Sequence, residues 1–163
     1  MRYRDCPTVE VTERIETTPE AAWALVTDID LPARHSPELQ SVAWVGDADR
    51  VAVGNRFVGH NRHPRMGEWS TESVVVEVED GRRWVWRVTA AGSTIATWGF
   101  EVDPGRGAVL VRQWGRMGPD PSGLTAVIAS MPDKEGRIIA HRLGEWEAGI
   151  RANLAGIRAE LGG

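Results

Sequence analysis

The sequence predicts an α+β fold in which a curved antiparallel sheet of six or seven strands wraps around one long C-terminal helix. Short stretches of alternating apolar residues recur through the middle of the chain, separated by turn-forming residues, which is the pattern of an antiparallel meander. A helix-like segment follows the first of these stretches, and apolar residues at helical spacing occupy the C-terminal end. No linker or repeat divides the chain, so residues 1–163 are expected to form a single domain.

The first elements are a strand over residues 8–16 and a helix over residues 19–29. Apolar residues alternate in the first segment, and Pro19 suits the first turn of the helix that follows. Pro32 and Pro37 then limit the chain to a short helical turn before the next strand begins. We therefore expect one or two short helices after the first strand.

The remaining chain alternates strands and turns until a final helix. The segment 118–136, with three prolines and three glycines, predicts a long ordered loop around a short apolar piece, with room for one helical turn. One helix lying across the concave side of a twisted sheet cannot fill it, so a cavity is expected. The predicted strands cover 39–45, 55–62, 69–79, 83–90, 94–102 and 108–114, and the helix covers 133–161.

Composition excludes several partners. The net charge is −4, the pI is near 5.6 and the arginines are scattered, so no electrostatic footprint for nucleic acid exists. No apolar run approaches the length of a membrane span or of a signal sequence, and Cys6 is the only cysteine. We expect a cytoplasmic monomer or homodimer without stable membrane insertion, whose partner is a hydrophobic small molecule.

The ligand-binding candidates follow from strand alternation and from the helix stripe, which place them toward the cavity. An indole either packs in an ordinary core or forms a flat wall for a planar ligand, and Asn61 either orients a ligand or satisfies backbone groups. Gly149 and Gly156 on the helix stripe permit either close packing or room for a ligand. The candidates are Asn61, Trp69, Thr71, Ser73, Trp84, Trp86, Trp98, Trp114, Trp146 and Asn153.

Four residues are candidates for catalysis. Arg112 shares a strand face with Trp114, and this face turns inward in the registration chosen here, while Arg142 lies on the helix stripe. Either guanidinium could steady an oxyanion or anchor an acid, or could form a structural ion pair. His35 and His63 could move a proton, although a loop histidine such as His35 is often only a surface residue.

No metal or other cofactor is predicted. His60 and His63 are three residues apart on a strand, so their side chains point to opposite faces and cannot share one ion. No cysteine or carboxylate cluster lies near them in the sequence.

The element order, together with "RHSPEL", "GNRFVGHNR", "EWSTESVVVEVEDGRRWVWRV" and "WEAGIRANLAGIRAEL", resembles the START/Bet v 1 (SRPBCC) superfamily. The likeness extends over residues 9–161 and is greatest to bacterial polyketide cyclase/dehydrase and lipid-transport proteins. It implies a helix-grip fold with a ligand cavity. Two functions stay open: cyclisation or dehydration of a polyketide-like substrate, and non-catalytic carriage or sensing of a lipid-like molecule. A protein-interaction module is a third reading, which predicts an exposed apolar patch.

The chain departs from the aromatic cyclases of this superfamily in two ways. These enzymes commonly carry a basic residue on the strand after the tryptophan, whereas Ser73 is followed here by three valines. Tyr3 is the only tyrosine, and we expect it to lie outside the core elements, which would leave the cavity without a phenol.

Overall fold

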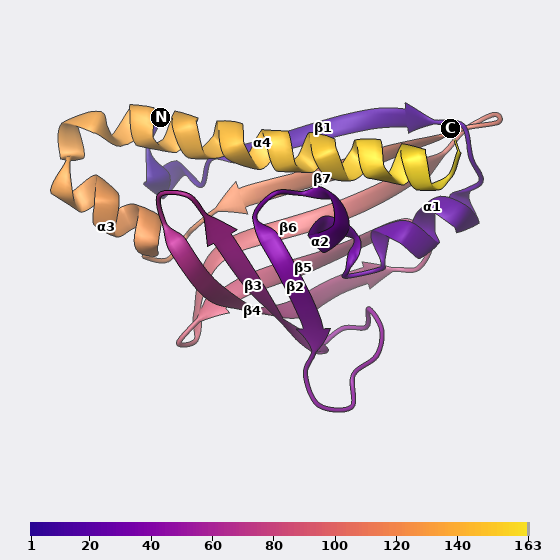
Figure 1. The fold of residues 1–163 in the computed structure, drawn as a ribbon, viewed down its shortest axis with the longest axis horizontal. Coiled ribbons are helices and arrows are strands. Elements are labelled where there is room, and N and C mark those ends of the chain that lie inside the picture. Colours follow the sequence, from indigo (N-terminus) through magenta and orange to yellow (C-terminus); the bar gives the residue numbers. More distant parts are fainter. Residues whose placement is uncertain (163) are drawn as a thin grey trace.

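The computed structural model describes residues 1–162 and has the expected α+β architecture. All seven strands join one antiparallel sheet in the order β1-β7-β6-β5-β4-β3-β2, and the long helix α4 (Glu135–Glu160) lies along β1 and across the curled sheet (Figure 1). The predicted helix-grip arrangement is thereby confirmed. The strands are β1 (Thr8–Ile15), β2 (Leu39–Trp44), β3 (Arg56–His63), β4 (Gly67–Glu79), β5 (Arg83–Ala90), β6 (Ser93–Pro104) and β7 (Val109–Met117).

Two short helices follow β1. In α1 (Pro19–Val26) the Oγ1 atom of Thr18 accepts a hydrogen bond from the Ala21 amide at 3.2 Å, which satisfies one free N–H of the first turn. The helix ends three residues earlier than predicted, at a tighter turn in which the Asp28 amide donates to the carbonyl of Leu25 at 3.2 Å. The second helix, α2 (Leu31–His35), occupies the stretch limited by the two prolines.

The long segment before α4 contains more helix than expected. In place of the single helical turn that the predicted loop allowed, the eight-residue helix α3 (Gly123–Ser130) forms, and the short 3-10 turn η2 (Pro132–Lys134) connects it to α4. The Ser122 amide donates to Thr125 Oγ1 at 2.7 Å, a local contact that starts a helix among residues otherwise rich in proline and glycine. Another 3-10 turn, η1 (Tyr3–Asp5), precedes β1.

Two tryptophan–glycine pairs fix the packing of β6 against β7. Trp98 is opposite Gly115, and Gly99 is opposite Trp114, so each glycine leaves room for the indole of its partner. Because neighbouring residues of a strand point to opposite faces, Trp98 covers the concave face and Trp114 covers the convex one. The concave side carries the main apolar core, which α1, α2 and α4 close.

No helix within residues 1–162 combines the length and the apolar character that crossing a bilayer requires.

Candidate functional site

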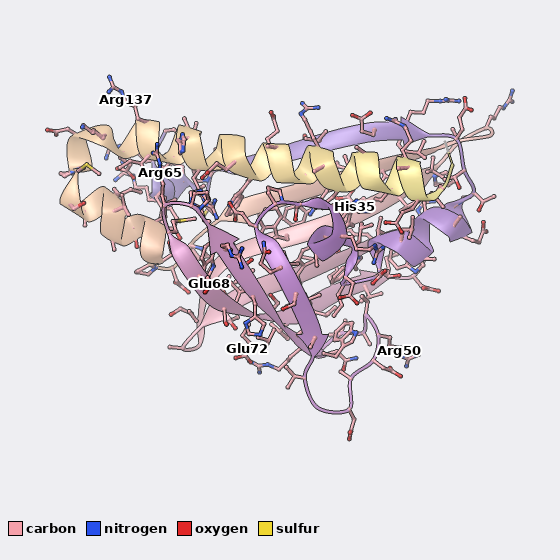
Figure 2. All side chains as sticks on the ribbon, in the orientation of Figure 1. His35, Arg50, Arg65, Glu68, Glu72 and Arg137 are labelled. Carbon is pink, nitrogen blue, oxygen red and sulfur yellow. The ribbon has the colours of Figure 1, made fainter. Side chains whose placement is uncertain are left out.

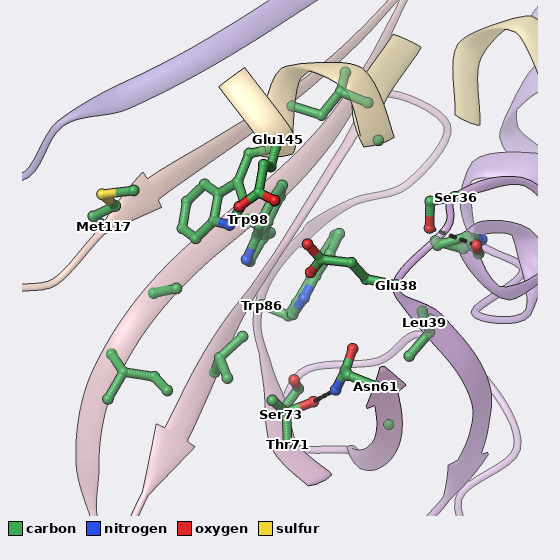
Figure 3. A pocket seen from close by; sticks show the side chains of 18 of the residues that line it. Ser36, Glu38, Leu39, Asn61, Thr71, Ser73, Trp86, Trp98, Met117 and Glu145 are labelled. Atoms are coloured by element: carbon green, nitrogen blue, oxygen red, sulfur yellow. Dashed lines mark hydrogen bonds between the residues drawn. The ribbon is translucent and has the colours of Figure 1, made fainter. Parts of the chain in front are cut away.

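A cavity of about 640 Å³ lies between the concave face of the sheet and α4. This volume falls within the roughly 300–1,000 Å³ of pockets that hold drug-sized ligands. Residues from β2 to β7 and from α4 line it, and Met66 and Val127 add exposed apolar side chains at its edge. Figure 3 shows this cavity from close by.

Aromatic rings form one continuous wall of the cavity. Trp86 stacks on Trp84 with ring centroids 4.3 Å apart and lies nearly parallel to Trp98, at 6.5 Å and 13°. Trp146 of α4 extends the row, 4.5 Å from Trp98. Trp84 also has a core role, because its Nε1 donates to the buried carbonyl of Val26 at 2.8 Å. Phe57 and Phe100 complete the wall.

The uncharged polar candidates lie where the sequence predicted them, around the same cavity. Asn61 donates to Thr71 Oγ1 at 3.3 Å, as Figure 3 shows, and Ser73 is buried next to them. On the opposite side Asn153 of α4 donates to Gln113 Oε1 at 3.0 Å, and both amides are 3% exposed. Trp69 also lines the cavity.

Charged groups gather at one edge of the cavity, where α4 meets the start of β2. Arg142 forms a bidentate pair with Glu38, with its Nη2 2.9 Å from Glu38 Oε2, and its Nη1 lies 3.1 Å from Glu145 Oε1. The other oxygen of Glu145 lies 2.5 Å from His63 Nε2. We call Glu38, His63, Arg142 and Glu145 the ion cluster. Figure 3 shows Glu38 and Glu145 projecting toward the cavity.

The ion cluster shifts the protonation equilibria of two of its members. Burial disfavours the charged form of Arg142, but hydrogen bonds to Glu38 and Glu145 outweigh this and raise its pKa. Burial also opposes ionisation of Glu145, yet hydrogen bonds from His63 and Arg142 hold the pKa of its carboxyl below the ordinary value. Both side chains therefore stay charged at neutral pH.

Both ring nitrogens of His63 are engaged. Its Nδ1 accepts hydrogen bonds from the backbone amides of Arg65 at 3.0 Å and Met66 at 3.3 Å, which places the ring proton on Nε2 facing Glu145. His63 is 9% exposed and is not part of the cavity wall formed by the described residues. As expected, His60 lies on the other face, where it contacts Ser70.

Carboxylates that are distant from His63 in the sequence lie next to it in the fold, although no such cluster was expected there. Glu38, His63 and Glu145 bring potential ligand atoms within 4.8 Å of one another, because α4 and the start of β2 converge on the end of β3. The guanidinium of Arg142 bonds both carboxylates. The single guanidinium thus neutralises one of the two carboxylate charges.

His35 lies away from the cavity. It ends α2, as Figure 2 shows. Its ring packs on α4 beside Gly156, where an added Cβ would come within 2.3 Å of the imidazole. His35 also pairs with Glu160, which Arg34 contacts at 3.1 Å. The histidine thus clamps α2 to α4, and the glycine is required for this approach. Gly149, in contrast, lines the cavity and has only Ser36 near its missing Cβ.

Arg112 and Trp114 face the convex side, opposite to the registration predicted from the sequence. Val111, Gln113 and Gly115 point inward because β7 pairs with β1 and β6 in the alternate phase. Arg112 contacts Glu10 and Glu101, each at 3.0 Å, and Trp114 donates to Glu101 at 3.1 Å. The prediction that Arg112 and Trp114 line the cavity is therefore wrong. Both belong to a network on the convex face, which we call the outer network and which includes Glu10 and Glu101. Glu68 and Glu72 lie on this outer side too (Figure 2).

Tyr3 is buried at the α3 end of the cavity, contrary to the expectation that it lies outside the core. Its hydroxyl donates to the carbonyl of Asp120 at 2.7 Å, and burial is the main reason that its pKa is raised. The 3-10 turn η1 folds the N-terminus back against Met117 and Ile139, a long-range contact that no local pattern predicts.

Sequence reasoning missed Glu38, Glu145 and Gln113 as residues of the site. Glu145 is adjacent to Trp146 and three residues after Arg142, a spacing that places Arg142 and Glu145 as neighbours on one helix face. Gln113 becomes visible only once the phase of β7 is known. Glu38 gives no local signal, because its partner Arg142 is 104 residues away.

Comparisons with known proteins agree with this geometry. The model of the family "Polyketide cyclase / dehydrase and lipid transport" matches residues 7–161. The Polyketide_cyc-like protein Cgl2372 of Corynebacterium glutamicum has 26% identity and a TM-score of 0.64, over 93% of this chain and 88% of that one. A comparison with curated proteins gives no match to this chain.

Two di-domain ARO/CYC proteins share the fold. BexL, of the BE-7585A biosynthetic pathway, has 18% identity and a TM-score of 0.70, and StfQ, of the steffimycin pathway, has 17% and 0.69. The alignments cover 95% and 97% of this chain but only 50% and 52% of those chains, so this chain spans about half of each. With the match to the family model over nearly its whole length, the chain belongs to the polyketide cyclase/dehydrase and lipid transport family.

Proposed function

We propose that this protein binds and carries a hydrophobic, planar small molecule in the cavity between the sheet and α4. The row of indoles is the observation that supports the proposal most directly, with Trp86 and Trp98 nearly parallel and Trp146 adjoining Trp98 at a tilt of 42°. A flat aromatic wall contacts a planar ligand over its whole surface, and aromatic pairs add to the free energy of apolar burial. Uncharged polar groups at two sides supply orientation.

The positions of the four catalytic candidates favour binding over acid–base chemistry. Arg112 belongs to the outer network, and His35 belongs to the contact between α2 and α4. Arg142 is paired with two carboxylates, and both nitrogens of His63 already have partners. A general base must reach the proton that it removes, and an oxyanion needs donors that are free to turn toward it.

Cyclisation or dehydration of a polyketide-like substrate is the second candidate, and Glu145 is the residue that favours it. Its carboxylate reaches the cavity and bonds both His63 and Arg142. In an aldol cyclisation, a base removes a proton from the carbon between two carbonyls and an acid protonates the new alkoxide. In this candidate Glu145 takes the proton from carbon and then returns it to the alkoxide oxygen, while Arg142 and His63 hold its carboxylate in place.

Filling the cavity tests the binding proposal. Gly149→Met projects a flexible apolar side chain into the cavity, whereas Gly144→Met makes the same change at a helix position with nothing within 4 Å of the added Cβ. The neutral fluorophore N-phenyl-1-naphthylamine serves as the ligand in an equilibrium titration. We expect saturable one-to-one binding, weakened about tenfold or more by Gly149→Met and unchanged by Gly144→Met. No saturable binding to the parent protein contradicts the proposal.

A small poly-β-ketone tests the second candidate, with the absorbance of the aromatic product as the readout. Turnover that Glu145→Gln abolishes and Arg112→Met preserves would establish cyclisation. Absence of turnover in a protein that binds the fluorophore would leave carriage as the function.

A further inference from the structure

Among the described residues, more acidic than basic side chains line the cavity. Three carboxylates line it, from Asp28, Glu38 and Glu145, against the single guanidinium of Arg142 within residues 1–162. Asp28 forms an ion pair with Arg34, which is not part of the cavity wall, and the two side-chain atoms are 2.8 Å apart. Arg142 alone then balances Glu38 and Glu145, so this edge of the cavity carries one excess negative charge.

Arg142, the one cation that lines the cavity among the described residues, already has carboxylate partners for both terminal nitrogens. Arg142 uses both terminal nitrogens on Glu38 and a second contact of Nη1 on Glu145, and its side chain is only 14% exposed. A carboxylate on a ligand would have to displace one of these partners. The displaced carboxylate would then remain in a partly buried place without a counter-charge, which is costly.

His63 offers no substitute for that cation. Its Nδ1 accepts from two backbone amides, and its Nε2 faces Glu145 instead of the cavity. His141, the other histidine near this cluster, contacts Glu145 only at 3.9 Å and is 67% exposed. At this edge a ligand anion therefore meets two fixed carboxylates and, within the part of the chain that the structure describes, no available positive group.

The remaining polar groups of the cavity are uncharged. Asn61, Thr71 and Ser73 lie on one side, and the amides of Gln113 and Asn153 lie on the other. Asn153 Oδ1 is buried and has no hydrogen-bond partner among the described residues. Hydroxyl and carbonyl groups of a neutral ligand match amides and hydroxyls without any ionic partner.

From this arrangement we infer that the cavity selects an uncharged planar ligand and excludes the matching carboxylate, with the ion cluster as the selecting element. The inference rests on the proposed function and adds the charge class of the ligand. A free acid, a fatty acid among them, is accordingly a poor ligand.

The test compares two ligands of nearly equal shape, 9-anthracenemethanol and anthracene-9-carboxylate, at pH 7.5. Energy transfer from the tryptophans of the cavity wall to anthracene reports binding. We expect the alcohol to bind at least about tenfold more tightly than the carboxylate, since like charges a few ångströms apart repel strongly in a partly buried site. Equal or tighter binding of the carboxylate overturns the inference while leaving the proposed function intact.

Two double variants distinguish repulsion by the ion cluster from the general free-energy cost of moving any ion into an apolar cavity. Glu38→Gln with Glu145→Gln releases Arg142, so the carboxylate should gain about tenfold or more in affinity while the alcohol changes less than about twofold. Asp47→Asn with Asp49→Asn removes the same charge from an exposed loop and should change neither affinity. If the first double variant leaves the carboxylate as weak as before, the ion cluster is not the selecting element.

Failure of the two proposals can be told apart. If neither anthracene nor N-phenyl-1-naphthylamine binds, the proposed function fails and this inference fails with it. The comparison of the two anthracenes on the parent protein needs no variant, so it holds even if the double variant does not fold.

Discussion

The benzene ring of Trp98 lies over Gly115, its partner on the neighbouring strand, so closely that a Cβ at position 115 would come within 2.6 Å of the ring. Trp114 has the same relationship to Gly99 on the other face of the sheet, where the closest approach would be 2.5 Å. The position of an indole in the cavity wall therefore depends on the absence of one side chain on the next strand.

Gly115→Ala should displace Trp98 and destabilise the fold. Overpacking typically lowers the free energy of unfolding by about 1–3 kcal/mol. Urea denaturation measures this loss, and titration with N-phenyl-1-naphthylamine should show weaker binding as well. Gly99→Ala is the matched control, because it should lower stability by a similar amount and leave the affinity unchanged. Equal effects of both variants on affinity would contradict the separation of the two faces.

Gly156→Ala and Gly144→Ala should have opposite effects although both lie in α4. The added methyl at position 156 meets the ring of His35, whereas at position 144 it meets nothing within 4 Å. We expect the first to lower the free energy of unfolding by about 1–3 kcal/mol and the second to raise it by up to about 1 kcal/mol through helix propensity. Thermal unfolding followed by circular dichroism checks both signs.

Acidification should remove a contribution to stability that depends on Glu145. Its pKa in the folded state lies below the ordinary value of 4.5, so folding favours the ionised carboxylate. The contribution is complete above the unfolded-state pKa and is lost as the pH falls through the lower folded-state pKa. Glu160, held by His35 and Arg34, adds to the same acid dependence.

The free energy of unfolding, measured in urea from pH 7 to pH 3, should fall less steeply in Glu145→Gln than in the parent protein. The Glu147→Gln variant, which alters an exposed carboxylate on the same helix, is the control. Identical slopes for the parent and Glu145→Gln would contradict the assignment.

The buried amides of Gln113 and Asn153 should be energetically coupled. Asn153→Leu leaves Gln113 Oε1 without its donor, and an unsatisfied buried polar group costs about 1–3 kcal/mol. The double variant Gln113→Leu with Asn153→Leu should therefore be more stable than the sum of the single changes predicts. Additive single effects from chemical denaturation would show that the bond contributes no coupling.

The sequence was sufficient for the order of the strands and of the long C-terminal helix, and for the inner face of β4, β5 and β6, but not for α3. Trp86 and Trp98 were placed correctly because strand alternation and turn residues are local signals. The phase of β7 was predicted wrongly, since Leu110, Arg112 and Trp114 are as compatible with one face as with the other. Only the pairing with β6, where each tryptophan needs a glycine opposite it, decides between the two.

The ion cluster could not be predicted from the sequence, for a different reason. Arg142 was identified from the helix stripe, but its partner Glu38 comes from the far end of the chain, and a pattern within one segment carries no information about it. The same holds for the contact of His35 with Gly156, in which a short helix and a distant glycine meet.

The two tryptophan–glycine pairs have a consequence for how the protein can change over evolutionary time. Substitutions around Trp98 reshape the chamber, while Trp114, held with Arg83 and Arg116 on the convex side, keeps the strands aligned. Residues that shape the cavity and residues that keep the strands aligned thus alternate along the same strands. Substitutions can therefore change the cavity-lining residues while the residues on the convex face are retained, so that ligand preference can evolve without loss of the fold.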